Sequence, residues 1–357
     1  MTAAPNTVTP VTATGTIRPI AEFDRPLWQR WFATREMAII GLLLLVLVVA
    51  AAIVPNFGSK ITMTYLLLDM FPILIIALPM TAIIVTGEID LSVASVVGLS
   101  SVLTGVLTQA GVPFTVAILL AIVGGVICGA INGFLVTAVG LPSLAVTIGT
   151  LALYRGLAVG LLGTTAVTDF PEFWTSLAKA KIGSTGVPVV VILFVVLAAI
   201  FAIMLHFTRF GRGVFAIGFS SGAARFTGVD VARTKLILFV LSGAVAALAG
   251  VYYTLRYGSA RGDNATGMEM QVIAAVLLGG VSIFGGRGAL HGVVAGVLLI
   301  GALASALRLA NVTSDVINII TGVLLIAAVV SSSVFAAFRN RRGARLRLAG
   351  TAQAAAK

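Results

Sequence analysis

Charged residues are scarce in this chain of 357 residues, where Asp, Glu, Lys and Arg together make up only 10%. Soluble domains carry about 25% charged residues. Apolar residues make up 59% of the chain, and the mean hydropathy is +1.13. These values exclude an ordinary soluble protein and predict an integral membrane protein. Because no polar segment is long enough to fold alone, we expect one helical bundle rather than two domains.

Reactive and metal-binding side chains are also few. The chain has one cysteine, Cys128, and two histidines, so neither an intramolecular disulfide nor a metal site is expected. It has no G-x-x-x-x-G-K-[ST] loop, so it should not hydrolyse ATP itself. The GFSSG stretch at 218–222 has the outline of a nucleophile elbow, but no strand precedes it. We therefore predict no enzyme activity and no cofactor.

Acidic residues number only 12 against 23 basic residues, which gives a formal net charge of +11. In a soluble protein such an excess would suggest nucleic acid. Here the basic residues gather at the ends of apolar runs, as expected for loops that stay in the cytoplasm. We therefore expect lipid as the surrounding partner and no nucleic acid.

Apolar runs long enough to approach a membrane span recur along the chain, since a span needs about 20 apolar residues. We count about ten, with the eighth short and broken by glycines, so nine is the alternative. If the N-terminus is inside, most of the basic residues fall at cytoplasmic ends, and both termini are cytoplasmic. An even number of spans follows, which favours ten. The predicted runs are 36–54, 64–86, 91–109, 113–138, 141–162, 187–208, 235–256, 269–284, 288–309 and 315–337.

The segments outside the spans divide the chain further. Residues 1–35 predict a flexible cytoplasmic tail without the features of a signal peptide, and 338–357 a basic cytoplasmic tail, around a transmembrane domain at 36–337. The longest loop on the opposite side, 163–187, either gates or receives a partner or is a plain connector.

The most charged internal break is 209–235, with five basic residues and one acid. Its middle predicts one short helix, which a serine can cap and Gly228 can end. We interpret this cytoplasmic loop as the docking site for a partner that supplies energy. The candidate docking residues are Ser220, Ser221, Gly222, Ala223, Ala224, Arg225, Phe226 and Gly228.

The chain also divides into two halves of five spans, which must then be inverted relative to each other in the membrane. Gly87 and Glu88 precede the third span, and Gly267 and Glu269 open the eighth, which is the third of its half. An acid at a helix start is favoured by the helix dipole.

A few polar residues within or beside the spans are candidates for the translocation path. Glu88 and Asp90 either bind a proton, ion or polar substrate, or serve structure, with Asp90 capping a helix and Glu88 pairing with a basic residue. Arg155 has an acid or a polar ligand as its natural partner, or extends toward the interface. Asn132 either binds sugar hydroxyls or holds helices together.

Three stretches carry a family resemblance. TGEIDLSVAS at 86–95 resembles GGIDLSVGS, and the run at 129–157 has an Asn-Gly, then a Pro, then a Thr-Leu-Gly-Thr-like sequence. The third comprises 211–231, 241–253 and 268–290. In this order they resemble the permease subunit of bacterial ABC sugar importers of the ribose, xylose, rhamnose and autoinducer-2 group, which is related to branched-chain amino acid permeases. Glu88 replaces the usual glycine and looks most similar to rhamnose-type permeases.

The resemblance implies an all-α membrane protein with the type II ABC importer fold in the bacterial inner membrane. It implies a second permease subunit, an ABC ATPase subunit with two nucleotide domains and a periplasmic sugar-binding protein. The expected function is the translocation path of an ATP-driven sugar importer, with rhamnose or another monosaccharide as cargo. The alternative is a secondary transporter of a small polar solute driven by protons or ions.

Overall fold

The computed structural model describes residues 35–324, 326 and 330. Within these residues every named element is a helix, and two isolated β-bridges are the only extended pairings. The predicted tails lie outside the described residues, except that Arg35 begins the first helix. The all-α expectation is therefore confirmed for the part of the chain that the structure describes.

Seven helices among the described residues are long and apolar enough to cross a membrane. They coincide with seven of the predicted runs. Their length and apolar surfaces suit the hydrocarbon core of a membrane. They are α2 (Arg35–Ile53), α3 (Lys60–Val85), α5 (Phe114–Thr137), α6 (Ser143–Leu162), α8 (Val190–Phe207), α11 (Val231–Tyr257) and α13 (Leu290–Leu309).

Three shorter apolar helices occupy the remaining predicted runs: α4 (Val93–Gln109), α12 (Met268–Leu278) and the helix Ser314–Leu324. The predicted end of the last run, at 337, lies outside the described residues. The predicted end of the eighth run, at 284, is wrong, because α12 stops at Leu278. Gly280, Gly285 and Gly286 follow with positive φ angles, which a continuing helix cannot accommodate.

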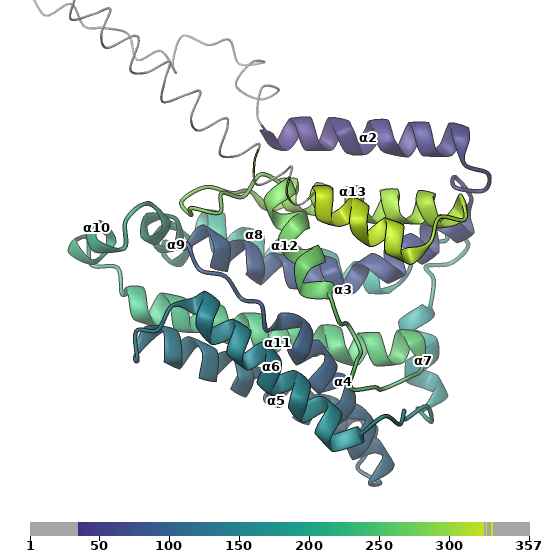
Figure 1. Ribbon diagram of the computed structural model, residues 1–357, viewed down its shortest axis with the longest axis horizontal. Coiled ribbons are helices and arrows are strands. Elements are labelled where there is room, and N and C mark those ends of the chain that lie inside the picture. The colour runs from purple at the N-terminus through teal and green to yellow at the C-terminus, as the bar shows by residue number, and fades with distance from the viewer. Residues whose placement is uncertain (1–34, 325, 327–329, 331–357) are drawn as a thin grey trace, which may run out of the picture.

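Helix α3 lies at the centre of the bundle and is buried over nearly its whole length. It packs against α11, α13, α12 and α8, whereas α2 and α8 present long apolar faces outward (Figure 1). Helix α11 is the second central element and packs against α5 and α4. Thus α3 contacts α12 and α13, and α11 contacts α4 and α5.

Close approach between α5 and α11 depends on glycine. A Cβ atom on Gly125 or Gly129 would overlap the carbonyl oxygen of Gly243 or Phe239 on α11, and a Cβ on Gly243 would overlap the backbone of α5. Small residues at such positions let two helix backbones touch, which maximises packing where water provides no driving force. Gly125, Gly129 and Gly243 therefore mark a place where the backbones of α5 and α11 touch.

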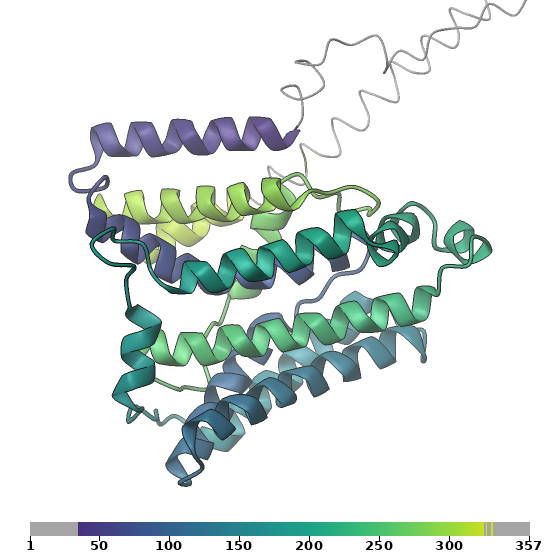
Figure 2. The same cartoon turned by 180° about the vertical axis from the view of Figure 1, so that it is seen from behind.

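The short helices outside the bundle lie at opposite ends of it. Helix α10 (Ser221–Phe226) and its neighbour α9 (Arg209–Phe219) project from one end, and α7 (Glu172–Lys179) lies at the other, in both views (Figures 1 and 2). We refer to these as the α10 end and the α7 end. The two loops that the sequence assigned to opposite sides of the membrane are thus separated by the length of the helices.

We expect Gly129→Ala to lower the free energy of unfolding by about 1–3 kcal/mol, because its methyl group must push α5 away from the α11 backbone. Gly41→Ala is the matched control, since nothing lies within 4 Å of a Cβ placed there on the outward face of α2. Thermal unfolding of the purified chain in detergent measures both. Equal melting temperatures for the two variants would contradict the contact.

Candidate functional site

The chain between α3 and α4 is a non-helical break at residues 86–92. Gly87 ends the turn after α3 with φ +82°, a conformation that suits glycine. The break leaves backbone groups without helical partners, and in a membrane these must find partners within the protein. Side chains of α5, α6 and α11 surround the break.

Asp90 is the buried carboxylate of this break, with 2% of its surface exposed. It accepts hydrogen bonds from the Ser92 amide at 3.0 Å, the Ser92 hydroxyl at 2.6 Å and the Ser242 hydroxyl of α11 at 2.8 Å. Ser92 rather than Asp90 is the N-cap residue of α4. The expectation that Asp90 itself caps α4 is wrong, although it accepts from the Ser92 amide as that interpretation held; Asp90 binds the cap residue and joins it to Ser242 of α11.

The network continues from Ser92 into α5 and α6. Asn132, which is 1% exposed, donates from Nδ2 to the Ser92 hydroxyl at 2.8 Å. The Tyr154 hydroxyl donates to the Cys128 carbonyl at 3.0 Å and lies 3.3 Å from Asn132 Oδ1. Asn132 thus joins helices, as one of its two interpretations held. The sequence reasoning missed Tyr154, although a tyrosine within an apolar helix signals a hydroxyl that needs a partner.

Glu88 forms an ion pair with Lys235 in the first turns of α11. Only 17% of the glutamate and 16% of the lysine side chain are exposed. The prediction that Glu88 pairs with a basic residue is confirmed. Helix α6 holds the residue between the two acids, because the Ser143 hydroxyl accepts from the Ile89 amide at 3.2 Å and Thr147 donates to the Ile89 carbonyl at 3.3 Å.

Arg155 donates its hydrogen bonds to backbone carbonyls, which were not among the expected partners, an acid or a polar ligand. Its guanidinium donates to Gly262 at 2.8 Å, Asn264 at 2.7 Å and Ala94 at 3.2 Å. The first two carbonyls belong to the segment between α11 and α12, and the third to the start of α4. An arginine with five donors in a fixed plane can serve several carbonyls at once. Arg155 therefore joins the first turn of α4 to the segment that precedes α12.

Glu269 lies in the first turn of α12, two residues after Gly267, whose φ is +85°. Gly87 has nearly the same φ, and Glu88 follows it. The glycine-acid pattern thus has the same glycine conformation in both places. Glu269 differs from Glu88 in that it makes no ion pair with another described residue. No cluster of metal-ligating side chains occurs among the described residues.

The charged loop 209–235 at the α10 end is ordered, and we refer to its part around α10, residues 220–228, as the elbow. Ser220 accepts from the Ala223 amide at 3.2 Å and caps α10, and Gly228 follows the helix with φ +84°, as predicted. Ala224 is only 2% exposed and packs with Ile217 and Val231. Phe226 is 95% exposed at the tip. Ala224 therefore holds the elbow together, and the exposed surface is formed by its neighbours.

Helix α9 connects this elbow to the bundle through a backbone junction. The carbonyl of Val85, the last residue of α3, accepts from the Gly286 amide at 2.8 Å. A Cβ on Gly218 of α9 would overlap both the Val85 carbonyl and the Gly286 nitrogen. Three segments thus meet without intervening side chains: α9, the end of α3 just before the break, and the loop between α12 and α13.

The α7 end is closed by short contacts between loops. Val167 pairs with Ala260 in a β-bridge, and Trp174 of α7 lies against Phe114 at the start of α5. At the surface the Arg261 guanidinium donates to Asp263 at 2.8 Å, and this hydrogen bond lowers the pKa of the Asp263 carboxyl. The predicted loop 163–187 is therefore structured around α7.

Comparison with known proteins gives a consistent result. A family model described as "Branched-chain amino acid transport system / permease component" matches residues 62–329. "Autoinducer 2 import system permease protein LsrD" of Yersinia enterocolitica is 39% identical over 272 residues, covering 74% of this chain and 82% of that protein. The protein of that name from Escherichia coli K12 is 38% identical over 305 residues, covering 84% and 92%. No solved structure gives a significant match.

We expect Glu88→Lys and Lys235→Glu each to lower the free energy of unfolding by about 1–3 kcal/mol. This range lies between exposed pairs, at about 0.2–1 kcal/mol, and fully buried pairs, at about 3–5 kcal/mol. The double exchange should recover most of the loss. A double-mutant cycle on thermal unfolding of the purified chain measures the coupling.

The exposed Arg261–Asp263 pair supplies the matched control, since more than half of each side chain is exposed. Reversing it should change stability by less than about 1 kcal/mol. If the Glu88 and Lys235 exchanges were additive, the ion pair would not stabilise the break.

Proposed function

The chain belongs to the family of ABC importer permease components, whose members are membrane subunits and not enzymes, and from this premise we propose its specific role. It forms the translocation path for a small sugar-like solute and depends on a separate subunit for ATP hydrolysis. The observation that carries this proposal is an ordered basic elbow with an exposed aromatic tip, linked by backbone contact to the end of α3.

We assign the α10 end to the cytoplasm of a bacterial inner membrane. Basic residues on α9, α10 and α11 gather there, which supports this orientation by the positive-inside rule. Helix α2 also starts at this end, in agreement with a cytoplasmic N-terminus, and the even span count then puts the C-terminus on the same side. The α7 end faces the periplasm in this orientation.

We assign the bundle to the type II importer fold with about ten spans in two inverted halves. The division pairs α3 with α11, α4 with α12 and α5 with α13. Under this pairing, the contacts of α11 with α4 and α5 correspond to those of α3 with α12 and α13. The matching φ angles of Gly87 and Gly267 before α4 and α12 support the same correspondence.

The exposed side of α10 is the proposed docking surface for an ABC ATPase subunit with two nucleotide domains. A phenylalanine exposed to 95% on a charged loop is costly in water and typical of an interface anchor. Movement of α10 passes through α9 to Gly218, and from there to Val85 and Gly286. The ATPase thereby acts on the break at 86–92 and on the loop after α12.

Two further partners complete the importer. A periplasmic binding protein delivers the solute at the α7 end. A second permease subunit, identical or homologous, packs against this one, and α6 is the candidate contact. Its outward face carries Gly149, Gly156 and Gly160, where a Cβ would meet nothing within 4 Å. Small residues on an outward face allow another helix to approach closely.

The relatives' names support a sugar-like solute, with autoinducer 2 as the leading candidate. Rhamnose, which Glu88 had suggested, has no support in those names. The alternative hypothesis, an ion-coupled secondary transporter, is less well supported, because the charged residues it would use already bond to other groups of the protein. Glu88 pairs with Lys235, Asp90 accepts three hydrogen bonds, and Arg155 serves backbone carbonyls. Uptake driven by an ion gradient without ATP would favour the rival.

We expect Phe226→Asp to weaken binding of the chain's own ATPase subunit by about 30-fold or more, because an interface anchor contributes about 2 kcal/mol or more. ATP-driven uptake in proteoliposomes should fall in parallel, while the amount of inserted protein stays constant. Gly222→Arg should have the same effect, since open space surrounds Gly222. Ala224→Glu would instead disrupt the elbow itself, because Ala224 is buried.

Phe173→Asp is the matched control, because Phe173 is 69% exposed but lies on α7 at the opposite end. It should leave ATPase binding unchanged. Normal ATPase affinity and uptake in Phe226→Asp would remove the docking role from the elbow.

A further inference from the structure

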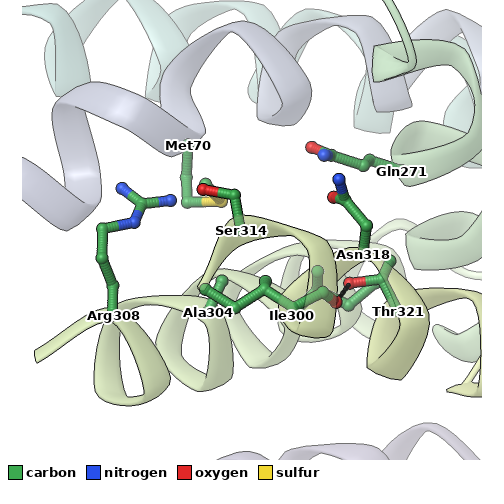
Figure 3. Close-up of a pocket in the computed structure, with 9 residues that line it drawn as sticks. Met70, Gln271, Ile300, Ala304, Arg308, Ser314, Asn318 and Thr321 are labelled. Atoms are coloured by element: carbon green, nitrogen blue, oxygen red, sulfur yellow. Dashed lines mark hydrogen bonds between the residues drawn. The ribbon is translucent and has the colours of Figure 1, made fainter. Parts of the chain in front are cut away.

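A polar cavity of about 170 Å³ lies between α3, α12, α13 and the helix Ser314–Leu324. Met70 and Ile300 contribute apolar side chains, and Gln271, Arg308, Ser314 and Asn318 contribute polar ones. Figure 3 shows the Arg308 guanidinium on one side of the cavity and the amides of Gln271 and Asn318 on the other. The space is sufficient for several water molecules or one small solute.

The polar groups of this cavity are uncommitted. Gln271, Arg308 and Asn318 form no side-chain hydrogen bond with any described residue, and Ser314 forms none either. Thr321 is satisfied, because it donates to the Ile317 carbonyl at 2.9 Å. Four polar side chains that form no hydrogen bond with the described part of the chain therefore converge on one space.

Polar side chains elsewhere in the bundle behave differently. Thr81 donates to the Ala77 carbonyl at 2.6 Å, Ser100 to the Val96 carbonyl at 2.7 Å, and Asn132 to Ser92. These three side chains are buried, where a polar group is costly unless it is hydrogen-bonded. Gln271 is half-buried and Arg308, Ser314 and Asn318 are exposed, so the polar groups of the cavity are open to a solute. The cavity thus offers polar side chains that are free to bind a solute, whereas the polar side chains at the break 86–92 are bonded to the protein.

We propose that this cavity is a substrate subsite of the translocation path and that it binds a small neutral polyhydroxylated solute. This inference rests on the proposed function. The amides of Gln271 and Asn318 can donate and accept, which matches hydroxyl groups, and Arg308 adds donors. Among the described residues that line the cavity, Arg308 alone is charged, so no second cation stands beside it for an anion. Met70 and Ile300 suit the C–H face of such a solute.

The position of the cavity connects it to the energy-coupling elements. Gln271 belongs to α12, and the loop after α12 contains Gly286, which bonds to the Val85 carbonyl beside Gly218. A displacement of the elbow can therefore shift α12 relative to the helix that carries Asn318. Such a shift changes the distance between the two amides and hence the affinity of the subsite, as alternating access requires.

The single cysteine makes a direct test possible. Cys128 is buried, so a Cys128→Ser background leaves no other thiol. In that background we compare Asn318→Cys with Val316→Cys, whose residue is exposed on the same helix but does not line the cavity. The complete importer, with its ATPase and binding protein, is treated with a membrane-impermeant thiosulfonate reagent. Autoinducer 2, ribose, rhamnose and glutamate serve as added solutes.

We expect Asn318→Cys to react at least about tenfold faster than Val316→Cys, and the transported sugar to slow that reaction at least threefold while glutamate does not. Reaction of Asn318→Cys as slow as that of Val316→Cys would overturn the subsite. So would reaction that is unaffected by the solute the wild-type importer carries, or protection by glutamate alone.

Transport kinetics give a second readout. Gln271→Ala and Asn318→Ala should raise the KM for uptake about tenfold or more and leave ATPase binding unchanged, while Val316→Ala should change neither. Unchanged KM in both cavity variants would also overturn the subsite. ATP-independent uptake would instead remove the proposed function, so the two failures are distinguishable.

Discussion

The fold depends on how the bundle satisfies a stretch of irregular backbone between two central helices. Residues 86–92 leave the helix at Gly87, and hydrocarbon offers no partner for the freed groups. The chain supplies those partners from three helices. Ser242 of α11, Asn132 of α5, and Ser143 and Thr147 of α6 all bond to the break or its first helical residue. The positions of these helices are consequently coupled to one short segment.

Arg155 also supplies hydrogen bonds to backbone carbonyls in this part of the bundle. Arg155 serves carbonyls in the first turn of α4 and in the segment before α12, so one side chain joins these two places. Glycine allows two backbones to approach more closely than side chains would permit. At Gly218 the backbone of α9 approaches Val85 and Gly286 too closely for any Cβ atom. Backbone contact of this kind has no rotamer freedom, so displacement of α9 moves its neighbours instead of being absorbed by a side chain.

Local features of the sequence predicted much of this architecture. Apolar runs gave the helices, and the Ser220 cap and the positive φ of Gly228 gave the elbow, because both depend on neighbouring residues. Contacts between distant residues were less accessible. A basic partner for Glu88 was expected, but its identity as Lys235, 147 residues away, was not. The backbone carbonyls that accept from Arg155 were not among its expected partners, and the burial of Ala224 depends on Ile217 and Val231.

The distribution of satisfied and unsatisfied polar groups separates the parts of the molecule by role. A path for a solute must exchange its partners during each cycle, so its polar groups cannot be committed to the protein. The break has no such freedom, since Asp90 alone accepts three hydrogen bonds. Gln271 and Asn318 have this freedom, because neither amide bonds to a described residue, and the helix that carries Gln271 leads directly into the loop that touches α9. Under the proposed function, rigid transmission through the break and adaptable recognition at the cavity would occur in separate places, so that force from the elbow alters binding without disrupting the fold.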